Sequence, residues 1–223
     1  MENYTIGLAL FDYLPVIAAG FGLYLICKYC AGLANYNGIW IVLIPVIALT
    51  GGTLKASWKL VWAVQHVNYT WMSDQLFFFL ASAYVLMAVL VVRSLQAAAN
   101  GNNLPKNWWV LPVQVIVVML AGAFYLKTST DGRTWNFLLL AVLSIANLVF
   151  LLSLMLHAKK VGVYPALIAF GLNLVLSYSL VGLARMEQTA ELQWIEEFMN
   201  LANNSLLAVG AWFLLRAQRR ESI

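Results

Sequence analysis

Apolar segments long enough to cross a membrane follow one another along the chain, and short polar segments separate them. A membrane-spanning helix requires about 20 predominantly apolar residues. Seven segments meet this requirement, at residues 5–27, 39–64, 72–92, 108–127, 135–156, 161–183 and 194–215. Turn-forming residues fill the breaks, as in the run Asn35-Tyr36-Asn37-Gly38 after the first segment. The pattern predicts an all-α integral membrane protein in which seven transmembrane helices form one bundle.

The composition excludes a soluble protein. Of the 223 residues, 63% are hydrophobic and 10% are charged, whereas about a quarter of residues are charged in soluble domains. The spans leave no room for a separate soluble domain of roughly 100 residues. We therefore expect residues 1–223 to form a single transmembrane domain in a lipid bilayer. The net charge of +4 is interpreted as a sign of membrane orientation rather than of nucleic-acid binding.

Basic residues between the spans predict the orientation, because cytoplasmic connections carry an excess of Lys and Arg. With the N-terminus outside, eight basic residues fall on the cytoplasmic side, namely Lys28, Arg93, Lys106, Lys159, Lys160, Arg216, Arg219 and Arg220. Three fall on the outer side, namely Lys127, Arg133 and Arg185. This bias predicts an outer N-terminus and a cytoplasmic C-terminus. The compact loops are typical of a protein of the bacterial inner membrane.

Two lysines, Lys55 and Lys59, lie inside the second span. A lysine at mid-span costs about 2.5 to 3.5 kcal/mol unless other groups compensate its charge. One helical face carries both lysines, because spacings of three, four, three and four residues separate Gly52, Lys55, Lys59, Trp62 and His66. We expect that face to point into the bundle.

Polar side chains in other spans are predicted at the same depth, in the outer half of the membrane. Asp12 lies about two turns into the first span, just before a bend at Tyr13-Leu14-Pro15. Spacings of four, three and four residues place four polar residues of the seventh span on one helical face, as a polar stripe. They are Gln193, Glu197, Asn200 and Asn204. The residues predicted in this layer are Asp12, Asp74, Asn173, Ser177, Arg185, Gln193, Glu196, Glu197, Asn200 and Asn204.

This layer has two interpretations. Buried ion pairs and asparagine hydrogen bonds hold membrane bundles together, so the layer could be purely structural. The number of charges gathered at one depth favours a polar cavity open to the outside. Lys55 and Lys59 repel each other unless a bound anion or Asp12 lies between them. We therefore predict a cavity, flanked by Trp58 and Trp62, that binds a small solute or a lipid headgroup with an anionic part.

The sequence contains no residue pattern that requires a metal or another cofactor, and we expect none. Cys27 and Cys30 have the spacing of redox and metal sites, but no further cysteine exists to complete a four-ligand site. Apolar packing is favoured for them over a redox role. His66 and His157 are predicted at opposite membrane faces, which excludes haem ligation by both within one chain.

The predicted topology resembles that of microbial rhodopsins, which have seven spans and an outer N-terminus. Two short stretches, Asn68-Tyr69-Thr70-Trp71 and Val209-Gly210, look weakly similar in sequence to that family. The retinal Schiff base of that family requires a lysine in the seventh span, and residues 200–215 contain none. The resemblance is therefore limited to topology, and the sequence assigns no family.

Three classes of function follow from these observations. The favoured class is a binding, transport or channel protein whose outward-facing cavity contains Lys55, Lys59, Asp12, Asp74, Glu197, Asn200, Asn204, Arg185 and Trp62. The alternative is a non-catalytic accessory subunit, whose charged layer meets a membrane partner or a second copy of the chain. A membrane-embedded enzyme ranks third, because the spacing of these residues does not demand a catalytic pair.

Overall fold

The computed structural model describes residues 5–130, 132–183, 186 and 189–221. Within these residues the chain forms eight helices, which are α1 (Ile6–Phe11), α2 (Tyr13–Leu33), α3 (Trp40–Gln65), α4 (Thr70–Ala99), α5 (Val110–Ser129), α6 (Thr134–Lys160), α7 (Tyr164–Leu183) and α8 (Ala190–Glu221). Seven helical stretches in the described part are long and apolar enough to cross a membrane, and α1 and α2 together make the first. The predicted all-α fold with seven membrane-spanning helices is confirmed.

Several helices continue beyond the apolar segments that predicted them. The first predicted segment stops at residue 27, but α2 runs to Leu33, and α4 runs to Ala99, beyond the predicted residue 92. Hydropathy marks only the part of a helix that lies in the apolar layer of the bilayer. The backbone hydrogen bonds of a helix are internal, so the helix can extend into the polar interface.

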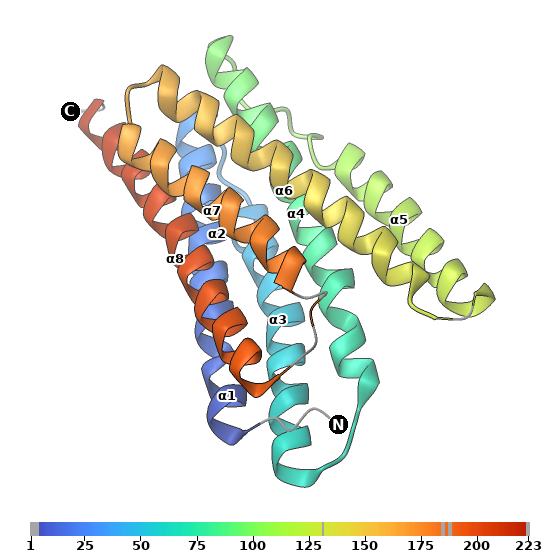
Figure 1. The fold of residues 1–223 in the computed structure, drawn as a ribbon. Helices are drawn as coiled ribbons and strands as arrows, with labels where there is room; N and C mark the ends of the chain where they lie inside the picture. The colour runs from blue at the N-terminus through green and yellow to red at the C-terminus, as the bar shows by residue number, and fades with distance from the viewer. Residues whose placement is uncertain (1–4, 131, 184–185, 187–188, 222–223) are drawn as a thin grey trace.

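The first span is broken at Asp12, where α1 ends and α2 begins. Pro15 follows in the first turn of α2, and a proline ring has no N–H and clashes with the carbonyl four residues before it. That carbonyl belongs to Phe11, so the break falls where the sequence placed a bend. The discontinuity puts the Asp12 carboxylate at a helix junction near one end of the bundle, here called the N-terminal end (Figure 1).

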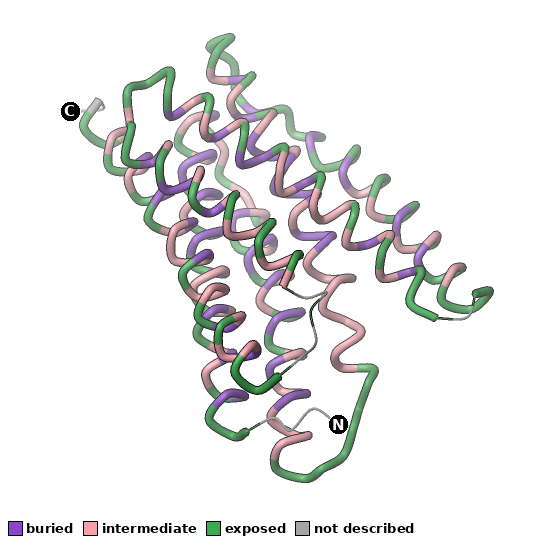
Figure 2. The backbone as a smooth tube through the Cα atoms, viewed as in Figure 1, coloured by how far each residue is buried: buried purple, intermediate pink, exposed green. Residues whose placement is uncertain are grey.

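Six helices form a closed ring in which each packs against the next, in the order α2, α3, α4, α6, α7 and α8, and α8 packs against α2. Helix α5 lies at the edge of the bundle against α4 and α6 (Figure 1). Buried residues concentrate on the faces that the ring helices turn toward one another (Figure 2). The helices of the ring therefore share an interior in which a site can form.

Small residues allow the backbone of α3 to approach its neighbours. A Cβ atom added at Gly52 would lie 2.8 Å from the side chain of Val16 on α2. A Cβ atom at Gly51 would lie 2.7 Å from Cβ of Phe79 and 3.1 Å from the carbonyl oxygen of Leu76, both on α4. Close approach through small residues is a common means of helix association in membranes. It fixes α3, the helix that carries both lysines, between α2 and α4.

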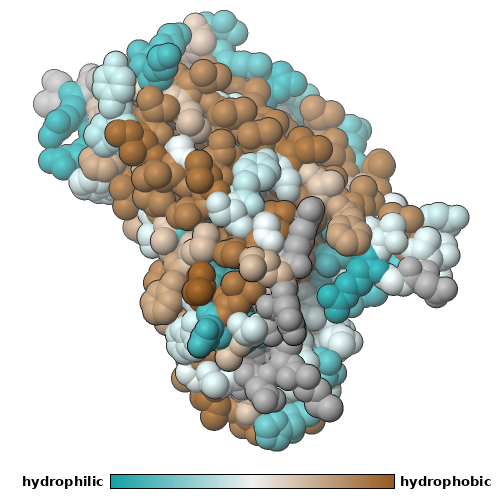
Figure 3. Space-filling view, viewed as in Figure 1, coloured by the Kyte–Doolittle hydropathy of each residue, from teal (hydrophilic) through white to brown (hydrophobic). Residues whose placement is uncertain are grey.

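The outer surface of the bundle is suited to lipid. A broad band of apolar residues covers the upper half of the face in Figure 3, with hydrophilic residues beyond it at the top. Large apolar side chains such as Val118, Phe124 and Ile145 are more than 60% exposed. Such surface is unfavourable in water and favourable in hydrocarbon. The chain is therefore a polytopic membrane protein in a lipid bilayer.

A buried ion cluster beside an amphipathic cavity

Lys59 forms the centre of an ion cluster that joins three spans. Its Nζ atom lies 3.0 Å from Oδ2 of Asp12 and 2.5 Å from Oε1 of Glu197 on α8. The three residues are almost completely buried, with exposed fractions of 6% for Lys59, 8% for Asp12 and 4% for Glu197. The two carboxylates compensate the buried ammonium. Removing the ammonium would leave both carboxylates buried without their ion-pair partner, and removing both carboxylates would leave the ammonium without one. We call these three residues the ion cluster.

The break in the first span contributes directly to the cluster. Asp12 is the residue between α1 and α2, so its side chain is held at the start of α2 rather than along a continuous helix. Asn204 on α8 donates a hydrogen bond from Nδ2 to the carbonyl oxygen of Pro15, at 3.1 Å. This bond links α8 to the first turn of α2. Asp12 and Glu197 are thereby brought to the same ammonium from separate helices.

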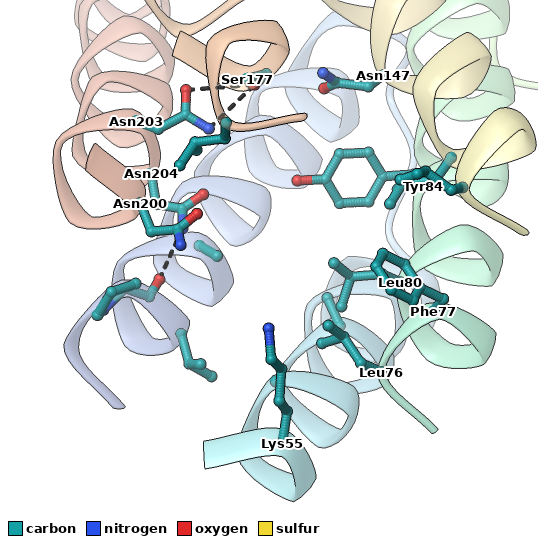
Figure 4. A pocket seen from close by; sticks show the side chains of 18 of the residues that line it. Lys55, Leu76, Phe77, Leu80, Tyr84, Asn147, Ser177, Asn200, Asn203 and Asn204 are labelled. Carbon is teal, nitrogen blue, oxygen red and sulfur yellow. Dashed lines mark hydrogen bonds between the residues drawn. The ribbon is translucent and has the colours of Figure 1, made fainter. Parts of the chain in front are cut away.

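Lys55 is placed one helical turn before Lys59, and its surroundings are different. It is partly buried, and its ammonium forms no ion pair or hydrogen bond with a described residue, although Asp12 and Glu197 attract it over a longer distance. It lines a cavity of about 420 Å³. In Figure 4 the Lys55 side chain extends from α3 into this cavity. The two lysines thus share a helical face but occupy different environments.

The cavity lies within the ring of six helices and has two walls of different character. The polar wall consists mainly of side chains on α8, together with Lys55 and the carboxylate at the break in the first span. Its residues are Asp12, Lys55, Glu197, Asn200, Asn203 and Asn204. The apolar wall consists of side chains on α4, α6 and α7, including Leu76, Phe77, Leu80, Phe137, Leu140, Leu143 and Leu180. Figure 4 shows Lys55 between these walls, with asparagines on one side and Leu76, Phe77 and Leu80 on the other. Ligand cavities in proteins are commonly apolar with a few polar groups that fix orientation.

Hydrogen bonds hold part of the polar wall in place. Asn173 donates from Nδ2 to the backbone carbonyl oxygen of Asn203 at 2.7 Å, which joins α7 to α8. Asn203 donates from Nδ2 to Oγ of Ser177 at 3.1 Å. These contacts place the predicted residues Asn173 and Ser177 beside the asparagines of α8. Their main effect is to fix the α7–α8 contact at the cavity.

The structure brings most of the predicted layer together. Asp12, Lys59 and Glu197 form the ion cluster, and Lys55, Asn200 and Asn204 line the cavity beside it. Of the face predicted to point inward, Gly52 and Lys59 are buried and Lys55 and Trp62 partly so, whereas His66 at its far end is exposed. This face of α3 therefore points inward along the helix except at its C-terminal end.

Two predicted residues lie elsewhere, and a third falls outside the described residues. Asp74 accepts a hydrogen bond from Nζ of Lys127 at 2.7 Å, in a partly exposed pair that joins α4 to α5 outside the cavity. Trp62 packs edge-on against Trp58, with ring centroids 5.2 Å apart, and neither indole is part of the described cavity lining. Arg185 lies outside the described residues.

Four polar residues at the cavity were missed in the sequence, namely Tyr84, Ser144, Asn147 and Asn203. Tyr84 on α4 and Asn147 on α6 both line the cavity, and the Tyr84 hydroxyl points across it in Figure 4. Tyr84, Ser144 and Asn147 are scattered polar positions in strongly apolar segments. The polar stripe on α8 has a helical repeat that can be recognised, whereas a single tyrosine or asparagine gives no such signal.

The cysteine and histidine residues do not line this cavity. Cys27 and Cys30 are free and fully buried in α2, inside the apolar core. His157 Nε2 and the Tyr29 hydroxyl are hydrogen-bonded at 2.6 Å, far along the bundle from His66 at the end of α3. Within the described ranges, no group of three His, Cys, Asp or Glu side chains is placed to hold a metal ion.

Comparison of the chain with protein-family models, with curated proteins and with solved structures finds no match.

Proposed function

We propose that this membrane protein binds a small solute with an anionic group in the cavity beside the ion cluster, as a binding or transport protein. The observation that supports this function most strongly is Lys55. Its ammonium extends into a cavity of about 420 Å³ and forms no ion pair or hydrogen bond with a described residue. Asp12 and Glu197 attract it only over a longer distance, so a bound anion could contact this intramembrane ammonium directly.

The difference between the lysines supports a ligand role over a purely structural one. Lys59 contacts both of its carboxylates directly, as a charge that holds helices together does. Lys55 acts on the same carboxylates only over a longer distance, and its ammonium forms no ion pair that would hold it against another helix. The asparagines and the Tyr84 hydroxyl near it could bind the remaining polar atoms of a ligand.

The orientation predicted from loop charges places this cavity in the outer half of the membrane. The ion cluster joins α3 and α8 at the break in the first span. A solute would therefore be bound on the external side, next to a helix junction. Under this proposal the protein acts in the plasma membrane of a bacterium.

Thermal unfolding of the purified protein with added anions tests the function. Phosphate, acetate and hexadecanoate serve as probes, and at least one should raise the unfolding temperature of the wild-type protein. Lys55→Met should abolish that gain. Leu143→Trp, which places an indole in the cavity, should also abolish it, whereas Ile145→Trp on the exposed face of α6 should leave it unchanged.

Two results would contradict the proposed function. One is that no probe stabilises the wild-type protein. The other is that Lys55→Met and Leu143→Trp, both folded, respond to the probes as the wild-type protein does.

A further inference from the structure

The two walls of the cavity point to the kind of molecule that fills it. A small hydrated anion such as phosphate would contact Lys55 and the asparagines and would leave the apolar wall without a partner. That wall is extensive, with Leu76, Phe77 and Leu80 on α4 facing Phe137 and Leu143 on α6. Apolar surface in a cavity favours a ligand that removes it from water. The lining therefore suits a molecule with one anionic group and an apolar body.

The cavity also reaches the lipid-facing surface of the bundle. Phe137 on α6 lines the cavity, yet 69% of its surface is exposed. Leu180 and Val181, near the end of α7, line the cavity opposite α6. Figure 1 shows α6 extending beyond the end of α7, so the first turns of α6 are not covered by α7. An apolar chain could therefore pass between the bilayer and the cavity along these side chains without crossing water.

We propose that the ligand is a single-chain amphiphile with one anionic headgroup, drawn from the bilayer. This inference rests on the proposed function and names the chemical class of its ligand. The headgroup pairs with Lys55 and receives hydrogen bonds from Asn200, Asn204 or the Tyr84 hydroxyl. The chain lies against the apolar wall of α4 and α6. A cavity of about 420 Å³ is of the size that holds one small organic ligand, rather than a two-chain phospholipid.

Photolabelling in neutral detergent tests the ligand class. The probe is hexadecanoate with a diazirine at the end of its chain, and labelled peptides are mapped by mass spectrometry. We expect labelling of the α4 and α6 peptides that contain Leu80 and Leu143, and competition by unlabelled hexadecanoate or lysophosphatidate. Acetate and hexadecanol should compete at least about tenfold more weakly, because each lacks one half of the ligand's chemistry.

Matched lysine variants complete the experiment. Lys55→Met should reduce competed labelling at least about tenfold, a loss typical of one charged partner. Lys127→Met, which alters a lysine outside the cavity, should leave the labelling unchanged. Lysophosphatidate competing better than hexadecanoate would identify a phosphate headgroup, and the reverse would identify a carboxylate. Either result supports the amphiphile.

Three results would overturn the inference. The first is labelling confined to lipid-facing residues such as Val118 and Phe124, and the second is equal labelling of wild-type and Lys55→Met. The third is Lys55-dependent stabilisation by phosphate or acetate without competed labelling by the chain probe. That last result would leave the proposed function standing, whereas the absence of any Lys55-dependent effect would remove both.

Discussion

Lys55 and Lys59 are the same residue type, one turn apart on one helical face, but the protein treats them differently. Lys59 is buried against two carboxylates from other spans, whereas Lys55 extends into a cavity and forms no ion pair with a described residue. A buried charge in direct contact with opposite charges is typical of one that holds helices together. A charge that enters a cavity without such a contact is typical of one that meets a ligand. Two intramembrane charges in one sequence motif can therefore have separate roles.

The largest expected effect is a difference in stability between variants of the two lysines. Lys59→Met leaves Asp12 and Glu197 buried against each other without the ammonium, so we expect a loss of about 3 to 5 kcal/mol in the free energy of unfolding. Lys55→Met removes an ammonium that attracts Asp12 and Glu197 without contacting them, so it should cost less than about 1 kcal/mol. Titration with sodium dodecyl sulfate, monitored by circular dichroism, measures the free energy of unfolding of both variants.

Equal losses of stability in Lys59→Met and Lys55→Met would contradict separate roles for the two lysines. In that case Lys55 would compensate the second carboxylate of the ion cluster at a distance, and its role would be structural. Lys55→Arg provides the control, because it keeps the charge and should behave as the wild-type protein in the titration.

A second prediction concerns the backbone that carries both lysines. Gly51→Ala places a Cβ atom 2.7 Å from Phe79 and 3.1 Å from the backbone oxygen of Leu76, so α3 must move away from α4. We expect a loss of about 1 to 3 kcal/mol in the free energy of unfolding. Gly122→Ala on α5 is the control, because its Cβ would lie 3.5 Å from Leu138. Equal stability of the two variants would show that close packing of α3 does not set the lysine environments.

A third prediction concerns the two carboxylates of the ion cluster and tests whether one of them is sufficient to compensate Lys59. Glu197→Gln removes one of two carboxylates, but Asp12 still compensates Lys59, and the new amide oxygen can still accept its hydrogen bond. We expect a loss of about 1 kcal/mol in the same titration. A loss as large as that of Lys59→Met would mean that both carboxylates are required, and that Asp12 alone cannot compensate the ammonium.

The smallest effect is expected at a third lysine, Lys127. Its pair with Asp74 is partly exposed, with side-chain exposed fractions of 38% and 30%, so solvent and headgroups screen the charges. Lys127→Ala should cost less than about 1 kcal/mol. A cost comparable to that of Lys59→Met would mean that burial does not explain the difference among the lysines.

Much of this arrangement could be predicted from the sequence, because it depends on helix depth. Apolar length alone predicts the spans. Counting residues along them places Asp12 and Glu197 at the depth of Lys59, and the structure brings the three together. Depth is a one-dimensional property that the sequence contains directly.

The rest depends on how the helices are rotated and which helices are neighbours. Asp74 has the right depth, but α5 lies beside α4 and presents Lys127 to it. Trp62 shares the lysine face but is turned against Trp58. Tyr84 and Asn147 line the cavity without a repeated polar pattern. These features follow from packing between segments, which hydropathy and spacing do not describe.

The most direct test of the different roles of the two lysines is their reaction with acetic anhydride, mapped by mass spectrometry on the folded protein. We predict that Lys55 is acetylated, that hexadecanoate protects it, and that Lys59 reacts only after unfolding. Equal reaction of Lys55 and Lys59 in the folded protein, or acetylation of Lys55 that no anionic probe slows, would contradict the account.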